Sequence, residues 1–397
     1  MEKEFPWKKV LILTATHLGT VILAVCLTLA LSQTAQDPGM RKLEQLAGYI
    51  KQYHVDDPDM GDVYDHAAAG MVAGTGDRWS YYISASEMAA YEASHKNAYV
   101  GIGVTVQLRE DESGIDVLSV TPGGPALEAG VMPGDIIVAV DDADVQKFSV
   151  DELSDKIRGE ENTDVRITVK RGEEKLSFTI TRRRIEVAVA TGKLLDGNVG
   201  YIKIANFNEK CYDETVAAID SLIHQGAEYL VFDVRGNPGG YKDEMVSVLD
   251  HLLPEGDLFM SVDYQGLTEV DTSDATCLKM PMAVLVNGDS YSAAEFFAAA
   301  LEEYGWAITG GEPTVGKGHM QVTKKLKDGS AVAISIAEYY TPNGISLEDQ
   351  GGLVPQILVE MDEEKAALLA SDLLEPEDDD QLQAIIAALT GKSQEKP

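Results

Sequence analysis

Cysteine is scarce in this chain of 397 residues, which has three: Cys26, Cys211 and Cys277. Cys26 lies inside an apolar N-terminal run, so the remaining pair allows one disulfide at most. The sequence has no CxxC pair and no Cys/His spacing typical of a metal site. We therefore expect no metal and no cofactor.

Basic charge is also scarce, with 32 Lys and Arg against 66 Asp and Glu and a formal net charge of −34 at pH 7. Binding to nucleic acid requires clustered Lys and Arg that neutralise phosphates. The composition therefore argues against a nucleic-acid partner and against adhesion of the folded part to anionic lipid. Part of the acidic excess is local, in the run 375–380, which we interpret as a solvated linker.

Charged residues are absent between Lys9 and Asp37, and residues 10–32 are mostly apolar. Such a run approaches the roughly 20 residues that span a bilayer. Because Lys8 and Lys9 precede it, residues 1–9 are expected to be cytoplasmic and the rest extracytoplasmic. A cleaved signal peptide is the alternative, but the run is longer than an ordinary signal core. We predict a single transmembrane anchor at 10–32 in the cell membrane.

The region from Val284 to Gln321 combines three residue types that suit nucleophilic catalysis. An uncharged run ending at Val286 predicts a buried strand, and Asn-Gly-Asp-Ser predicts a turn after it. An alanine-rich helix is expected next, which places Ser292 at a strand-to-helix corner. Free amides and the positive dipole end of a helix favour developing negative charge there.

A serine nucleophile needs a base, and Lys317 lies downstream between two glycines. Burial can lower the pKa of a lysine enough for its neutral amine to accept a proton. Gln321 follows Lys317 and can orient the amine, as a third group orients the base in other triads.

Simpler interpretations apply to the same residues. Ser290 or Ser292 can be a helix N-cap, which is the commoner role of a serine at such a corner. Gly-Lys-Gly can be a surface turn with a solvated Lys317. His319 suggests a Ser-His-Asp triad, but no Gly-x-Ser-x-Gly pattern supports one, and we interpret it as a non-catalytic neighbour. Local pattern alone favours these interpretations.

A second block, 229–240, reads Tyr-Leu-Val-Phe-Asp-Val-Arg-Gly-Asn-Pro-Gly-Gly. It predicts a buried strand followed by a glycine-rich turn that exposes backbone amides. An ordinary strand-to-helix connection is the simpler interpretation. Asp233 and Arg235 are expected to be structural rather than catalytic.

Taken together, these motifs resemble the carboxy-terminal processing proteases, or tail-specific proteases, which are Ser-Lys peptidases with an inserted PDZ domain. Their pattern of Val-Asn, small residues and Ser-Ala-Ser-Glu is similar to residues 285–295, with departures at Asp289, Tyr291 and Ala294. Further similar blocks lie at 70–82 and near the C-terminus, so the resemblance extends over about residues 40 to 392. The aromatic residues of 70–82 are interpreted as a packing and dimerisation module.

The resemblance implies roles for individual residues. Ser292 would be the nucleophile, Lys317 its base and Gln321 the partner of the base. The oxyanion hole would use the amide of Ala293 together with that of Gly239 or Gly240, a choice that the sequence leaves open. Each such donor contributes on the order of 3 kcal/mol to a transition state.

Residues 117–140 resemble a PDZ domain closely, and Val165-Arg-Ile-Thr-Val alternates as a half-buried strand should. A PDZ domain binds a peptide as an extra strand along a sheet edge, and loop amides capture the terminal carboxylate. The predicted peptide-binding residues form that loop and the start of the pairing strand: Val100, Gly101, Ile102, Gly103 and Val104.

We thus predict a multidomain protein of mixed α/β and α+β class. After the anchor come a helical segment at 40–96, a PDZ domain at 97–185, an α/β protease core at 186–361, and an acidic linker with a C-terminal helix at 362–397. The predicted function is a membrane-anchored serine endopeptidase that acts on proteins with free C-terminal tails, as a homodimer by resemblance. A catalytically inactive PDZ scaffold at the cell envelope is the alternative.

Overall fold

The computed structural model describes residues 16–22, 37–109, 114–148 and 150–391. The chain divides into two compact units, 1–71 and 72–397. The expected anchor at 10–32 lies mostly outside the described residues, and only its part at 16–22 is seen, as an exposed helix. Within the described ranges no helix is both long and apolar enough to cross a membrane.

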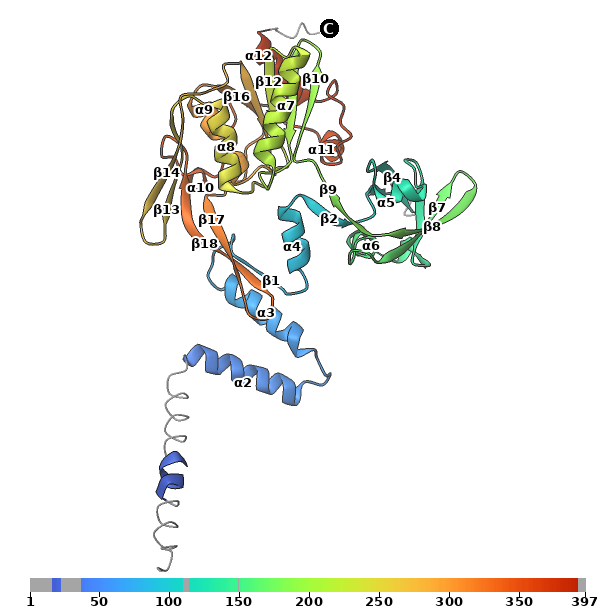
Figure 1. Ribbon diagram of the computed structural model, residues 1–397, viewed down its shortest axis with the longest axis vertical. Helices are drawn as coiled ribbons and strands as arrows, with labels where there is room; N and C mark the ends of the chain where they lie inside the picture. The colour runs from blue at the N-terminus through green and yellow to red at the C-terminus, as the bar shows by residue number, and fades with distance from the viewer. Residues whose placement is uncertain (1–15, 23–36, 110–113, 149, 392–397) are drawn as a thin grey trace, which may run out of the picture. The chain divides into compact units, whose positions relative to one another are not determined.

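The first unit contains α2 (Pro38–Tyr53) and most of α3 (Met60–Ala73), drawn in blue in Figure 1. The carboxylate of Asp37 accepts a hydrogen bond from the Gly39 amide at 2.6 Å and caps α2. Neither helix has a buried side chain, so these described residues form no core of their own.

A parallel sheet forms the centre of the second unit, with the strand order β10-β11-β12-β15-β16-β19 in the described chain. From β11 to β19 the strands pair in parallel, and β10 pairs antiparallel at one edge. The strands are β10 (Ala190–Leu195), β11 (Val199–Ile204), β12 (Tyr229–Asp233), β15 (Met282–Val286), β16 (Ala307–Gly311) and β19 (Ile357–Leu358). β15 is buried along its whole length, as expected for a strand covered on both faces.

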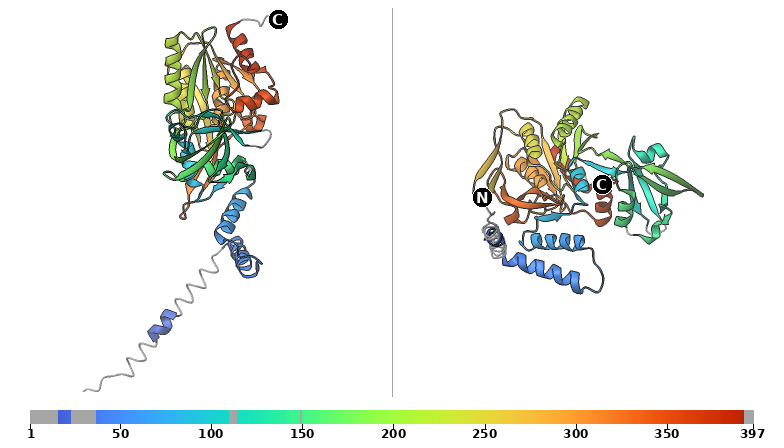
Figure 2. Two further views of the ribbon diagram at one scale, coloured as in Figure 1. Left: turned by 90° about the vertical axis from the view of Figure 1, so that its right-hand side faces the viewer. Right: turned by 60° about the horizontal axis from the view of Figure 1, so that its bottom comes forward.

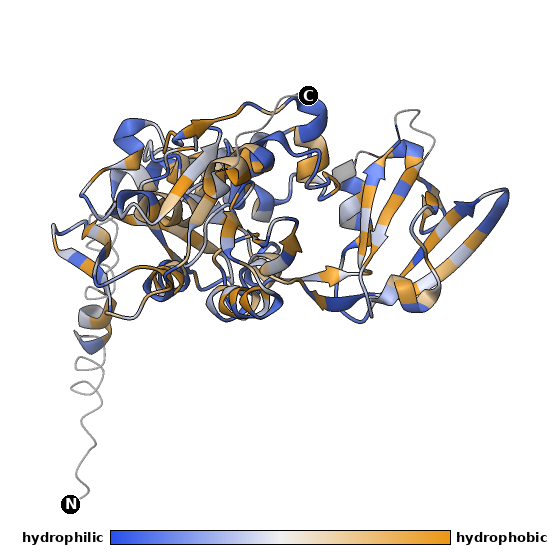
Figure 3. Cartoon of the chain, turned by 90° about the horizontal axis from the view of Figure 1, so that it is seen from above, coloured by the Kyte–Doolittle hydropathy of each residue, from blue (hydrophilic) through white to orange (hydrophobic). Residues whose placement is uncertain are grey.

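Helices cover both faces of this sheet (Figures 1 and 2). The helices are α7 (Cys211–Gln225), α8 (Lys242–Leu252) and α9 (Ala293–Glu303) on one face and α12 (Asp380–Thr390) on the other. Phe297 of α9 packs edge-on against Phe232, while Leu382 packs with Leu285 on the opposite face. Figure 3 shows apolar and polar residues along the same ribbons by their hydropathy. Cys211 and Cys277 are both free thiols, so no disulfide joins them.

An antiparallel sheet adjoins the parallel one, with the order β1-β18-β13-β14 and with β17 also paired to β18. Its strands are β1 (Tyr81–Ile83), β13 (Gly256–Asp263), β14 (Thr268–Ser273), β17 (His319–Lys325) and β18 (Ala331–Tyr340). Two short helices lie in this part of the chain, α4 (Met88–His95) and α10 (Leu347–Gln350), whereas α11 (Glu363–Ala370) follows β19 of the parallel sheet. β1 lies within the segment predicted to be mainly helical and pairs with a strand about 250 residues later.

The segment predicted as a PDZ domain has its own sheet, in the order β3-β4-β5-β7-β8, and its own buried core. Its strands are β3 (Val104–Leu108), β4 (Ile115–Val120), β5 (Ile136–Val140), β6 (Ala143–Asp144), β7 (Asp164–Arg171) and β8 (Glu174–Thr181), and its helices are α5 (Pro125–Ala129) and α6 (Val150–Ile157). Alternate residues of β7 are buried, and Figure 3 shows the matching change of colour along the strands. A ribbon of β2 (Ala98–Gly101) and β9 (Arg183–Glu186) precedes and follows this sheet.

The acidic run 375–380 is not entirely a solvated linker, which corrects our expectation. Asp379 is 3% exposed and accepts hydrogen bonds from the buried Arg235 at 3.1 and 2.7 Å. Arg235 also donates to Asp233, which in turn accepts from the Tyr201 hydroxyl at 2.7 Å. A buried charge needs such partners, so Asp379 fixes α12 to the carboxyl end of β12.

Replacing Asp379 with Asn should lower the free energy of unfolding by about 3 kcal/mol, because it leaves part of a buried charge uncompensated. Asparagine retains the N-cap of α12, so the loss reports on charge rather than on the cap. Urea unfolding measures it, with the exposed Asp378→Asn as matched control. Equal stability of the two variants would contradict the expectation.

Candidate active site

Two turns that lie far apart in the sequence meet at one edge of the parallel sheet. β12 and β15 are adjacent parallel strands, so the turns after their carboxyl ends lie side by side. The amide of Gly236 donates to Asn287 Oδ1 at 2.9 Å, and Ser290 Oγ donates to the carbonyl of Val234 at 2.7 Å. Ser290 is fully buried and holds the two turns together, which is a structural role.

Ser292 occupies the corner between β15 and α9, as the pattern predicts. It is the N-cap residue of α9, and its backbone has φ 59° and ψ −128°. Positive φ is uncommon for a residue other than glycine and persists only where the surroundings impose it. Ser292 is thus an N-cap by its position, and this position does not exclude a role as the nucleophile.

The glycine-rich turn after β12 lies directly against this serine. A Cβ atom built on Gly239 would be 2.8 Å from Ser292 Cβ and 3.0 Å from the Ala293 nitrogen. Only glycine permits this approach, and its φ of 88° also favours glycine.

The two candidate oxyanion amides differ in what they bond. The Gly239 amide donates to Asn237 Oδ1 at 2.8 Å. Gly240 and Phe207 form a parallel β-bridge. Its two hydrogen bonds run from the Phe207 amide to the Gly239 carbonyl and from the Tyr241 amide to the Phe207 carbonyl, so Gly240 itself makes neither of them. The Gly240 amide therefore points away from Phe207, and no described residue accepts its hydrogen bond.

Glu295 is one residue of this site to which our sequence reasoning gave no role. Its carboxylate is fully buried and accepts hydrogen bonds from the amides of Ser292 (2.8 Å), Gly316 (2.6 Å) and Lys317 (2.8 Å). The Thr314 hydroxyl donates to it as well, at 2.5 Å. One carboxylate thus joins the serine corner to the lysine loop. A charged residue inside an otherwise apolar, alanine-rich helix was the available signal, since such a group needs buried partners.

Lys317 is half-buried, and burial lowers the pKa of its amine against the opposing effects of Asp77 and Glu295. Its Nζ atom lies 5.2 Å from the ring centroid of Trp79 and 5.8 Å from that of Tyr291. The surface-turn interpretation of Lys317 is therefore wrong. Trp79 belongs to a segment that we interpreted as a packing and dimerisation module, and no pattern in the sequence indicates this contact.

Gln321 lies on β17 beside a shift of register between Met320 and Gln321. Such bulges re-aim side chains next to active sites. Its Nε2 atom donates to the His319 carbonyl at 2.9 Å and to Ser335 Oγ at 3.0 Å, which leaves its carbonyl oxygen as the acceptor. Among the described residues no hydrogen bond joins Gln321 to Lys317 or Lys317 to Ser292.

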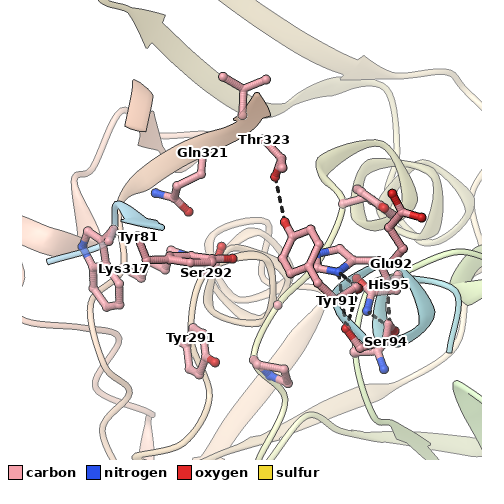
Figure 4. Close-up of a pocket in the computed structure, with 18 of the residues that line it drawn as sticks. Tyr81, Tyr91, Glu92, Ser94, His95, Tyr291, Ser292, Lys317, Gln321 and Thr323 are labelled. Atoms are coloured by element: carbon pink, nitrogen blue, oxygen red, sulfur yellow. Dashed lines mark hydrogen bonds between the residues drawn. The ribbon is translucent and has the colours of Figure 1, made fainter. Parts of the chain in front are cut away.

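A cavity of about 970 Å³ is lined by the predicted catalytic residues except Ala293, which directly follows Ser292. Its lining includes Ser292, Lys317, Gln321, Gly239 and Gly240, and Figure 4 shows the first three on the same side of it. α4 lines the other side, where the Tyr91 hydroxyl bonds to Thr323 Oγ1 at 2.7 Å. His319 is not part of this lining and pairs with Glu348 at 2.5 Å.

The predicted peptide-binding residues lie at the entrance to β3. Val100 and Gly101 end β2, Ile102 and Gly103 form the link, and Val104 begins β3. The carbonyls of Ile102 and Gly103 accept from Ala126 and Thr121, whereas their amides bond to no described residue. β3 is an edge strand of its sheet, paired only with β4 in the described chain. Free amides beside an open edge suit a peptide carboxylate.

Comparison with known proteins shows the family of this chain. Residues 198–359 match the model of peptidase family S41, and residues 117–171 match that of the PDZ domain. The carboxy-terminal processing protease CtpA of Bacillus subtilis (strain 168) is 32% identical over 333 residues, 83% of this chain and 71% of that protein. The chain belongs to peptidase family S41. It is a serine peptidase of the carboxy-terminal processing type with a PDZ domain.

A second relative supports the assignment, and a solved structure shows the same fold. The carboxyl-terminal-processing protease of Synechocystis sp. (strain ATCC 27184 / PCC 6803 / Kazusa) is 32% identical over 298 residues, 73% of this chain and 68% of that protein. A crystal structure from Bacteroides fragilis NCTC 9343, titled as an S41 protease, has a TM-score of 0.59 at 16% identity. It covers 88% of this chain and 98% of its own, and at this identity it shows the fold alone.

Replacing Glu295 with Gln should lower kcat about tenfold or more, since a hydrogen bond to a charged group contributes about 1.5–3 kcal/mol. The side-chain NH2 group of Gln would also face the backbone amides of Ser292 and Lys317, which are donors themselves. We expect this repulsion to displace Ser292 relative to Lys317. Steady-state peptide cleavage measures the effect. Glu303→Gln serves as control, because Glu303 is on the same helix but bonds to Thr341 and Asn343. Unchanged kcat in Glu295→Gln would show that the carboxylate does not position the site.

Proposed function

We propose that this S41 peptidase cleaves proteins by a Ser-Lys mechanism in which Gln321 assists the base. The observation that carries the proposal is the shared cavity of a serine at positive φ and a half-buried lysine with a lowered pKa. Ser292 Oγ attacks the scissile carbonyl while the neutral Lys317 amine takes its proton. The lysine then returns that proton to the leaving amine, and water hydrolyses the acyl-enzyme. The Gln321 carbonyl oxygen accepts from Nζ as the substrate closes the site.

For the oxyanion hole we favour Gly240 over Gly239 as the partner of Ala293. The Gly239 amide is already bonded to Asn237, whereas that of Gly240 faces away from Phe207 without a described acceptor. Ala293 is the first residue of α9, so its amide is one of the free donors of a helix N-terminus. Two such donors stabilise the tetrahedral oxyanion, each by about 3 kcal/mol.

The PDZ domain, in this proposal, receives the C-terminal tail of the substrate along β3. The free amides of Ile102 and Gly103 support this role, since they are placed to bind a terminal carboxylate. An inactive PDZ scaffold is the less favoured function. A strained serine and a desolvated lysine in one cavity are costly and have no use in a scaffold.

Replacing Ser292 with Ala should abolish cleavage of an unstructured protein such as casein, and Lys317→Ala should do the same. Because activity requires the neutral amine, the rate of the parent should rise with pH up to the pKa of Lys317 and fall away in acid. Gel-based cleavage at several pH values, with residues 37–397, measures both. Full activity of Lys317→Ala would exclude the mechanism.

A competition arm of the same experiment addresses the PDZ domain. A peptide with apolar C-terminal residues and a free carboxylate should change the cleavage rate, whereas its C-terminally amidated form should not. Equal effects of the two peptides would contradict recognition of the terminal carboxylate.

We also propose that residues 10–32 anchor the peptidase in the cell membrane, with its active site outside the cytoplasm. The uncharged run after Lys8 and Lys9 supports this topology. Fractionation of cells should recover the full chain with membranes and residues 37–397 in the soluble fraction. Recovery of the full chain as a shortened soluble form would favour a cleaved signal peptide instead.

A further inference from the structure

Trp79 is fixed on several sides beside the catalytic lysine. Its backbone amide donates to Asp77 Oδ1 at 2.9 Å, and its ring Nε1 donates to Glu348 Oε1 at 3.4 Å. The guanidinium carbon of Arg78 lies 4.2 Å from its ring centroid. The ring therefore has a defined orientation although it belongs to the segment before β1.

The same residues also hold the loop of the lysine. Arg78 donates to the carbonyl of Gly316 at 3.3 Å. Glu348, which accepts from Trp79, also accepts from the Gly318 amide at 3.1 Å. Both neighbours of Lys317 are thus bonded to residues that fix Trp79. Lys317 Nζ itself lies 5.2 Å from the Trp79 ring, with Tyr291 at 5.8 Å.

We propose that Trp79 is a positioning residue for the general base, whose ring excludes water from the Lys317 amine and holds it in the cavity with Ser292. This inference rests on the proposed Ser-Lys mechanism. It gives a specific task to a segment more than 200 residues before the nucleophile in sequence.

The ring has two opposing electrostatic effects on the amine. Its π face attracts an ammonium group, which favours the charged form. Its bulk removes water, which favours the neutral form. Two carboxylates favour the charged amine: Asp77, in the same segment as Trp79, and Glu295, on α9. The cation nearest the ring is Arg78, whose guanidinium carbon lies 4.2 Å from the ring centroid. The pKa of Lys317 is lowered in spite of both carboxylates, because burial of the amine outweighs them. The Trp79 ring, 5.2 Å from Nζ, is part of what buries the amine, so we infer that its exclusion of water outweighs its attraction for the charged form.

The test is the pH profile of kcat/KM for Trp79→Ala and Trp79→Phe in residues 37–397. Trp79→Ala should move the acid limb upward by about one pH unit, which lowers the rate on that limb about tenfold. Trp79→Phe keeps an apolar wall and should restore most of the parental profile. Trp306→Phe is the matched control, since its ring nitrogen bonds to the Leu278 carbonyl away from the cavity. An unchanged acid limb in Trp79→Ala, or one moved toward lower pH, would overturn the inference.

A second readout does not depend on activity. In a Ser292→Ala background, the pH dependence of acetylation of Lys317 by acetic anhydride, followed by mass spectrometry, reports the pKa of its amine. Trp79→Ala should raise the pKa of the Lys317 amine, and thermal unfolding shows whether each variant is folded.

The role of Trp79 and the Ser-Lys mechanism can fail separately. If Lys317→Ala remains active, the proposed mechanism itself fails. If Lys317→Ala is inactive but Trp79→Ala leaves the amine unchanged, only the role of Trp79 fails.

Discussion

The active site depends on the buried carboxylate of Glu295. Ser292 follows β15, whereas Lys317 lies in the loop before β17, and neither strand pairs with the other. Glu295 accepts hydrogen bonds from both residues' amides and from the loop residues between them. Charge-assisted bonds of this kind are short and about twice as strong as neutral ones. The distance between nucleophile and base is thereby set through backbone atoms, and their side chains stay available for chemistry.

The parallel sheet supplies the rest of the site by bringing together turns that are distant in sequence. The turn after β12 contains Gly239 and Gly240, and the turn after β15 contains Ser292. The two turns lie together because adjacent parallel strands end at the same edge of the sheet. Behind this edge, Arg235 is bonded to Asp233 and Asp379, so the C-terminal helix α12 fixes the start of the glycine-rich turn. The antiparallel sheet adds β17 with Gln321 and, through β1, the segment of Trp79.

Elements with a strong local pattern could be predicted from the sequence. The apolar run to Val286, the turn and the alanine-rich helix predict β15 and α9, because burial and turn chemistry are encoded by neighbouring residues. Contacts between distant residues have no such periodic signal. Asp379 resembles its acidic neighbours in sequence, and only the position of Arg235 makes it a buried partner. The contact of Trp79 with Lys317 likewise depends on the fold as a whole.

A lysine that acts as a general base must be held in place and must also be kept neutral. A carboxylate bonded to the amine would hold it firmly but would raise its pKa and keep it protonated. Glu295 favours the charged amine only through space, because it accepts from the backbone amide of Lys317 and its remaining acceptor capacity is filled by Ser292, Gly316 and Thr314. The amine itself lies over the rings of Trp79 and Tyr291, which attract it without the full charge of an ion pair. Glu295 thus fixes the backbone of Lys317, while the rings of Trp79 and Tyr291 make the surroundings of its amine less polar. Different residues therefore hold the base in place and favour its neutral form.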